Sequence, residues 1–132
     1  MLDTGGHVQL DALNEFAYED ADHQPRVYGH NGAVVVELHG EVDLLAYQQI
    51  APLLDPITGG TATTVVIDLT HTTFFDCSGL GLLVRARRRT TARDARLAVV
   101  CTDPLTLRVL RLTGLTPMLQ PVSTLEEALR QE

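Results

Sequence analysis

Short apolar runs separated by turn residues dominate the chain from residue 25 onward. Residues 26–28 and 34–38 flank Asn31 and Gly32, a pair typical of a tight hairpin between two strands. Residues 65–69 and 97–101 are nearly continuous aliphatic runs, as in the buried strands of a parallel sheet. The pattern therefore predicts an antiparallel pair of strands followed by two parallel ones.

Helical signals lie between and after these strands. Asp43 is placed to cap a helix that we expect to stop before Pro56. A second helix is predicted over residues 80–89, and Asp103 with Pro104 opens a third that ends at Gly114.

The last part of the chain predicts one more strand and one more helix. Residues 118–122 suit a short edge strand, because they contain a proline, and residues 123–126 form a capping box that opens the final helix. The order β-β-α-β-α-β-α-β-α predicts an α/β fold. We expect a mixed sheet with an antiparallel start, parallel crossovers and helices packed on it.

Acidic residues are concentrated at the start of the chain. Residues 1–24 hold six of the 17 acidic residues and no arginine, whereas residues 25–132 are nearly neutral. We expect residues 1–24 to be a flexible acidic leader and residues 25–132 to be one domain. Without a net basic footprint, direct binding to nucleic acid is not expected.

The remaining composition narrows the class of protein. The first 30 residues contain no long apolar run, so we expect a cytoplasmic protein without a membrane segment. Cys77 and Cys101 match no metal-ligand spacing. No metal, cofactor or disulfide is implied.

The turn before the second predicted helix is the main candidate site. Asp76, Cys77, Ser78 and Gly79 follow a buried strand, and open α/β sheets place their sites at such carboxyl ends. Ser78 has two interpretations with roughly even weight on the residues alone. It caps the helix through its hydroxyl, or it carries a phosphate that the helix N-terminus tolerates.

Several motifs resemble one family, the anti-sigma factor antagonists built on the STAS domain. Residues 76–81, Asp-Cys-Ser-Gly-Leu-Gly, are similar to that family's Asp-Ser-Ser-Gly-Leu-Gly turn. Residues 40–43 resemble its Gly-Glu-Leu-Asp, residues 65–69 its central strand, and residues 110–115 its late helix. The resemblance covers about residues 25–132 and implies a single STAS domain.

The resemblance also implies a function without enzymatic activity. The unphosphorylated protein would bind an anti-sigma factor with serine kinase activity and release a sigma factor, and phosphorylation of Ser78 would abolish binding. A serine phosphatase is implied as a second partner. The residues that the resemblance assigns to partner binding are Asp43, Asp76, Cys77, Gly79 and Leu80.

Two departures and three alternatives accompany this interpretation. Cys77 replaces a serine, which leaves one acceptor hydroxyl in the turn, and residues 44–46 are apolar where the family is polar.

One alternative is a STAS subunit that scaffolds a larger complex without phosphorylation. Another is a hydrolase with Cys77 or Ser78 as nucleophile and His71 as base, although the turn lacks a hydrolase elbow. Arginines at 85, 89, 93 and 96 are expected to form a solvated face rather than a binding stripe.

Overall fold

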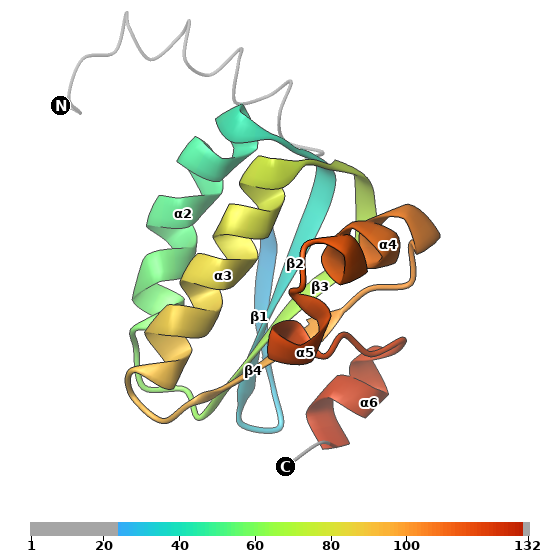
Figure 1. Cartoon of the computed structure of the whole chain (residues 1–132). Coiled ribbons are helices and arrows are strands. Elements are labelled where there is room, and N and C mark those ends of the chain that lie inside the picture. The colour runs from blue at the N-terminus through green and yellow to red at the C-terminus, as the bar shows by residue number, and fades with distance from the viewer. Residues whose placement is uncertain (1–23, 131–132) are drawn as a thin grey trace, which may run out of the picture.

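The computed structural model describes residues 24–130, which form one four-stranded sheet with helices on both faces (Figure 1). The predicted leader lies almost wholly outside these residues. The strands are β1 (Arg26–His30), β2 (Ala33–Val42), β3 (Thr64–Phe75) and β4 (Arg96–Val100). The helices are α2 (Leu44–Thr58), α3 (Cys77–Thr91), α4 (Pro104–Leu112), α5 (Thr116–Leu119) and α6 (Leu125–Arg130).

The sheet confirms the predicted mixture of strand directions. Its order is β1-β2-β3-β4, with β1 antiparallel to β2 and the remaining neighbours parallel. Asn31 and Gly32 join β1 to β2 with φ angles of 50° and 85°, the left-handed conformation that a two-residue hairpin needs. Because β2 and β3 are parallel, their carboxyl ends and the helices that follow them lie at the same end of the sheet.

The two faces of the sheet carry cores of different size. Helices α2, α3, α4 and α5 contribute to the larger core, which includes Val36, Ile67, Leu83 and Leu110. Helix α6 covers part of the opposite face through Ala128, against Val35, Val66, Ala98 and Val100. None of the helices within residues 24–130 has the length and apolar character needed to cross a lipid bilayer.

Helix α2 does not stop before Pro56, as the sequence predicts, but continues to Thr58. Pro52 and Pro56 both lie on its exposed side, while Leu54 and Thr58 face the core. A proline removes the amide that would bond to the carbonyl four residues earlier. The two missing amides lie on the solvent-facing side, and burial of the other side holds the helix together.

The predicted edge strand at residues 118–122 is also wrong in most of its length. Helix α5 occupies Thr116–Leu119, and Gln120 follows it with a φ of 43°. A single parallel bridge between Val100 and Val122 is all that remains of the expected pairing. Pro117 suits the first turn of a helix, and Pro121 has no amide to donate to a ladder.

The last helix has its capping box one residue later than predicted. The Glu127 amide donates to Thr124 Oγ1 at 3.1 Å, and the Glu127 carboxylate accepts from the Ser123 amide at 3.2 Å. Helix α4 begins as expected, because Asp103 caps it and Pro104 occupies the first turn. These local contacts fix where the helices after β4 begin.

Candidate functional site

Two capping aspartates stand side by side at the carboxyl end of the sheet. Asp43 Oδ1 accepts from the Ala46 amide at 3.0 Å at the start of α2, and Asp76 Oδ1 accepts from the Ser78 amide at 2.8 Å at the start of α3. The preceding residues, Val42 and Phe75, are paired in the sheet. The Asp76 amide donates to the Val42 carbonyl at 3.3 Å. The turn therefore has a fixed position beside the start of α2.

Ser78 is the second residue of α3, and it is not the cap. That role belongs to Asp76, so the interpretation of Ser78 as a capping residue is wrong. The Ser78 side chain is half-buried, and its hydroxyl makes no hydrogen bond to another residue in the described range 24–130. The hydroxyl is thus available for modification without loss of the cap.

Gly79 and Leu80 lie below the surface of the turn. A Cβ atom on Gly79 would stand 2.7 Å from Cζ of the Phe75 ring, which packs directly over the glycine. Leu80 is only 7% exposed and belongs to the larger core. Among the predicted partner-binding residues, Cys77 is exposed and Asp43 and Asp76 are half-buried, whereas Gly79 and Leu80 support the turn from beneath.

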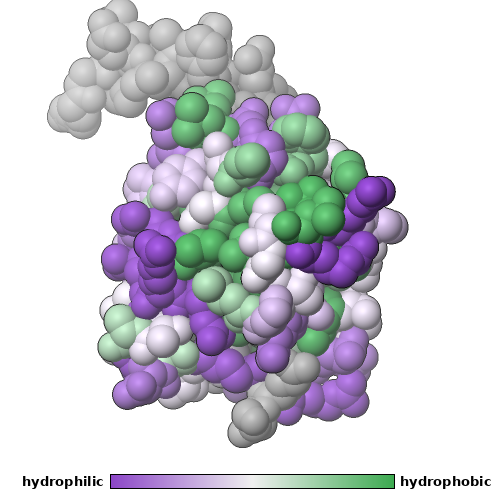
Figure 2. Space-filling view, in the orientation of Figure 1, coloured by the Kyte–Doolittle hydropathy of each residue, from purple (hydrophilic) through white to green (hydrophobic). Residues whose placement is uncertain are grey.

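Exposed apolar side chains surround this end of the sheet. Leu44 and Leu45 are each 61% exposed, and Phe74 is 52% exposed. Phe74 pairs with Glu41 in the sheet, so it lies close to the start of α2. Figure 2 shows hydrophobic residues at the end where α2 and α3 begin. The sequence singled out the two leucines as a departure from the family, and Phe74, near the end of β3, adds to the exposed apolar surface beside them.

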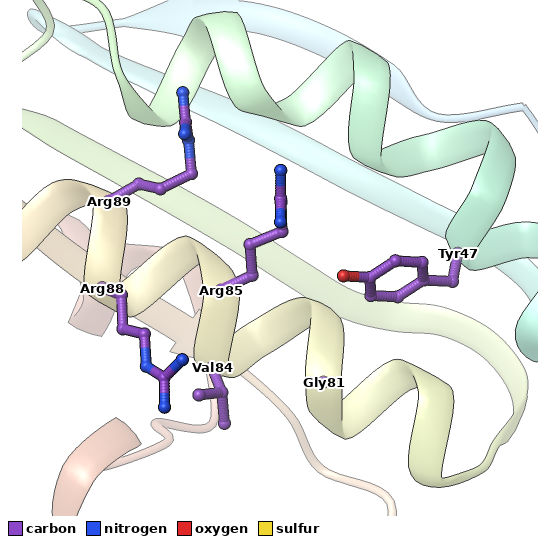
Figure 3. A pocket seen from close by; sticks show the side chains of 6 residues that line it. All are labelled: Tyr47, Gly81, Val84, Arg85, Arg88 and Arg89. Atoms are coloured by element: carbon purple, nitrogen blue, oxygen red, sulfur yellow. The ribbon is translucent and has the colours of Figure 1, made fainter.

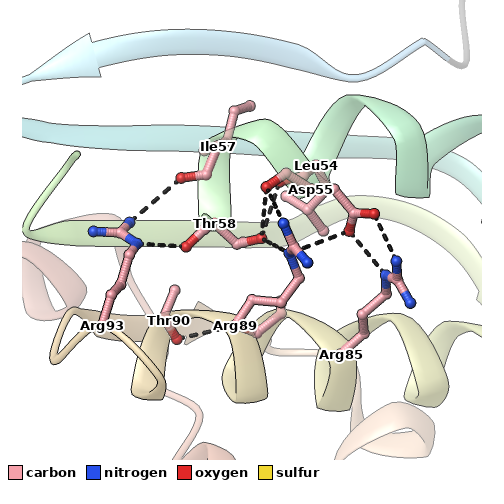
Figure 4. Close-up of polar contacts among 9 residues, drawn as sticks. Leu54, Asp55, Ile57, Thr58, Arg85, Arg89, Thr90 and Arg93 are labelled. Atoms are coloured by element: carbon pink, nitrogen blue, oxygen red, sulfur yellow. Dashed lines mark hydrogen bonds and ion pairs between the residues drawn. The ribbon is translucent and has the colours of Figure 1, made fainter. Parts of the chain in front are cut away.

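The four arginines at 85, 89, 93 and 96 do not form the single solvated helix face that the sequence predicts, because α3 ends at Thr91 and β4 begins at Arg96. Arg85 makes two hydrogen bonds to the Asp55 carboxylate, at 2.8 and 2.6 Å, and this pairing holds the pKa of Asp55 below its ordinary value. Arg93 donates to the carbonyls of Thr58 and Ala62, both at 2.6 Å. Figure 4 shows these side chains reaching from α3 and the turn after it to the end of α2. Arg85, Arg89 and Arg93 thus join α3 and the turn after it to α2, whereas Arg96 donates to the Ala128 carbonyl of α6 at 2.7 Å.

A second polar cluster lies on the opposite face of the sheet. Glu37 and Asp68 pair across β2 and β3, and each is 6% exposed. His39 contacts Glu37 at 3.1 Å and stacks on His71 with ring centroids 4.9 Å apart. Burial and the two carboxylates raise the pKa of the nearby Tyr28. Within the described part of the chain, no group of three potential ligands is placed to hold a metal ion.

This cluster bears on the hydrolase alternative. His71 lies in β3 rather than in a loop, and its stacking partner is His39. Neither Ser78 nor Cys77 has a hydrogen bond to a histidine among residues 24–130. The nucleophile–base contact that a hydrolase needs is not made here. In the sequence, the only sign of this polar cluster was one acidic residue in each of two otherwise apolar predicted strands, Glu37 and Asp68.

The fold and the turn define a STAS domain. The STAS domain family matches residues 24–128, and the chain belongs to this family. That span includes the sheet, both capping aspartates and Ser78.

The similar proteins are regulators by name. The anti-sigma-F factor antagonist RsfB of Mycobacterium tuberculosis is 30% identical over 103 residues, which is 78% of this chain and 84% of that protein. An anti-sigma F factor antagonist of Lysinibacillus sphaericus is 34% identical over 97 residues, covering 73% of this chain and 82% of the relative.

Solved structures agree on the fold. An anti-sigma factor antagonist from Mycobacterium paratuberculosis superposes with a TM-score of 0.75 at 27% identity, over 80% of this chain and 90% of that one. The Bacillus cell fate determinant SpoIIAA in its phosphorylated form gives a TM-score of 0.63 at 29% identity, over 80% and 96% of the two chains.

Proposed function

We propose that this protein is an anti-sigma factor antagonist controlled by phosphorylation of Ser78. The observation that carries the proposal is the position of Ser78 as the second residue of α3, with its hydroxyl unused by the cap. Homologues named for this function support it, and so does a phosphorylated structure within the family. In the unphosphorylated state the protein binds an anti-sigma factor that is also a serine kinase, and a sigma factor is released.

A phosphate at Ser78 is compatible with the fold. The first amides of a helix lack partners within the helix, and the helix dipole favours negative charge at this end. The phosphate stands at the start of α3, whereas the bonds that hold the helix pair together lie at its other end. Modification therefore changes the surface and leaves the packing intact.

The same phosphate weakens partner binding. It adds about −1.5 to −2 charges close to the two capping carboxylates and to the exposed Leu44, Leu45 and Phe74. A partner surface that is complementary to apolar side chains is not complementary to a doubly charged phosphate. A loss of ~3 kcal/mol corresponds to about a hundredfold lower affinity.

The chain offers a simple test, because Ser78 and Ser123 are its only serines. The purified protein is incubated with ATP and each anti-sigma factor kinase encoded in the same genome, and phosphopeptides are mapped by mass spectrometry. We expect phosphate on Ser78, complete loss in Ser78→Ala, and no change in Ser123→Ala. Absence of transfer to Ser78 by every kinase tested would contradict the switch and favour an unphosphorylated scaffold.

Affinity measurements test the consequence of the modification. We expect Ser78→Asp to bind the kinase about a hundredfold more weakly than the wild type in titration calorimetry, and Ser78→Ala to bind with nearly unchanged affinity. Leu44→Gln with Leu45→Gln weakens binding without loss of stability, since both side chains are largely exposed. Equal affinity of wild type and Ser78→Asp would exclude a charge-based switch. A dedicated serine phosphatase would restore binding.

A further inference from the structure

A groove runs along α3, starting one helical turn beyond Ser78. It has a volume of about 440 Å³ and is lined by Tyr47, Gly81, Val84, Arg85, Arg88 and Arg89. Figure 3 shows Arg85 and Arg89 extending toward α2, Arg88 and Val84 extending the other way, and Tyr47 reaching over from α2. A partly apolar floor is thus bordered by arginines on both sides.

The groove retains positive charge after its internal contacts are counted. Helices α2 and α3 carry four arginines, at 85, 87, 88 and 89, and one acidic residue, Asp55. Arg85 donates to the Asp55 carboxylate at 2.6 Å, and Arg89 lies 3.5 Å from the same carboxylate. Arg89 also donates to the Asp55 carbonyl at 3.0 Å and to Thr58 Oγ1 at 3.2 Å. Arg88 is exposed and makes no hydrogen bond to a residue of the described range. The groove therefore suits an acidic segment that also contains apolar residues.

The chain itself contains such a segment. Residues 1–23 hold six acidic residues and no lysine or arginine, with apolar side chains such as Leu10, Leu13 and Phe16 between them. We propose that this acidic leader docks in the groove between α2 and α3. The sequence alone favours an undocked leader, and the arginine-bordered groove is the observation that changes this expectation.

The topology brings the leader to the correct end of the domain. Strand β1 starts at Arg26, opposite Glu37, and reaches its hairpin at the far end of β2. The chain therefore enters the sheet from the end where α2 and α3 begin. A 23-residue segment spans up to about 75 Å, and the 15 residues of α2 extend only about 22 Å.

Tethering makes a weak contact sufficient. A covalently attached segment experiences an effective concentration of about 1 mM. An interaction with a Kd of about 1 mM between separate molecules would then occupy the groove half of the time.

The test compares amide NMR spectra of full-length proteins and needs no partner, so its outcome is independent of the proposed function. One variant converts the six leader acids to their amides: Asp3→Asn, Asp11→Asn, Glu15→Gln, Glu19→Gln, Asp20→Asn and Asp22→Asn. We expect the signals of Gly81, Val84 and Arg88 to shift in this variant. About 1 M salt should move the wild-type signals in the same direction, because it screens charges beyond about 3 Å.

Reciprocal variants locate the contact. Arg88→Gln should shift leader signals between Glu15 and Asp22, whereas Arg108→Gln, on the exposed side of α4 outside the groove, should not. Unchanged groove signals in the amide variant would overturn the proposal. Groove signals that respond to added polyglutamate but not to leader charge would assign the groove to another molecule and would overturn it as well.

Discussion

Different kinds of contact hold the two ends of the α2–α3 pair: the starting end, where both helices have their N-termini, and the finishing end, where both have their C-termini. At the starting end, caps from Asp43 and Asp76 span three and two residues along the chain, and the surrounding side chains are exposed. At the finishing end, Arg85, Arg89 and Arg93 make bonds that span 30 to 36 residues. Long-range side-chain bonds are thus concentrated away from Ser78, where the long-range polar contact is the backbone bond from the Asp76 amide to the Val42 carbonyl. The surface around Ser78 is free to change charge because the far end holds the helices in place.

The largest effect is expected from closing the space under Phe75. Gly79→Ala places a Cβ atom 2.7 Å from the ring, so the ring must move, at a cost of about 2 kcal/mol in the free energy of unfolding. Gly81→Ala is the matched control. Its Cβ would be 3.8 Å from Tyr47, and helix propensity alone favours alanine by about 1 kcal/mol. Urea denaturation of both variants tests this, and equal stabilities would contradict the packing argument.

The finishing end is probed by Arg93→Ala. The variant removes two short bonds, one to the carbonyl of Thr58 at the end of α2 and one to the carbonyl of Ala62 beyond it. We expect a loss of about 1.5 kcal/mol in the free energy of unfolding, typical of hydrogen bonds to a charged donor. Arg108→Ala on α4 removes an equal charge from an exposed position and should change stability by less than about 0.5 kcal/mol. Thermal and chemical unfolding of the two variants give the comparison. Similar losses would mean that net charge, rather than interhelix bonding, sets the stability.

The starting end is probed through its caps. Asp43→Ala and Asp76→Ala should each cost about 1 kcal/mol, whereas the Asp→Asn variants keep an acceptor oxygen and should stay close to the wild type. Ser78→Ala should be nearly neutral, because the cap of α3 is Asp76. A larger loss for Ser78→Ala than for Asp76→Ala would contradict this assignment of the cap.

The smallest effect concerns acid stability. Hydrogen bonding to Arg85 lowers the pKa of Asp55 in the folded protein. The resulting stabilisation is present above the unfolded-state pKa of about 3.9 and is lost as the pH falls through the lower folded value. Asp55→Asn should therefore flatten the loss of unfolding free energy below about pH 4, with Asp94→Asn as control. An unchanged slope in denaturation between pH 5 and 2 would contradict the pairing.

Much of the fold followed from local patterns in the sequence. The Asn31–Gly32 hairpin, the buried strands and the caps at Asp43 and Asp103 were all predicted, because each depends on residues close together in the chain. The end of α2 was not predictable in this way. Its continuation through Pro56 depends on the burial of Leu54 and Thr58 against residues distant in sequence.

The site divides along the same line. The sequence placed Ser78 in the turn between a strand and a helix starting at residue 80, whereas α3 already starts at Cys77 and Ser78 is its second residue. The sequence did not reveal that Asp76 is the cap, that Leu80 is buried, or that the arginines bond across to α2. Those properties depend on which helix face meets the core, and a shift of two or three residues in the start of α3 changes the answer.

The hairpin offers a practical consequence for experiments in living cells. Asn31 and Gly32 are exposed at the opposite end of the sheet from Ser78, and nothing lies within 4 Å of a Cβ atom built on Gly32. Exposed loop tips accept insertions well. A fluorescent reporter inserted between these residues would follow assembly and release of the protein while leaving the serine and its surroundings unlabelled.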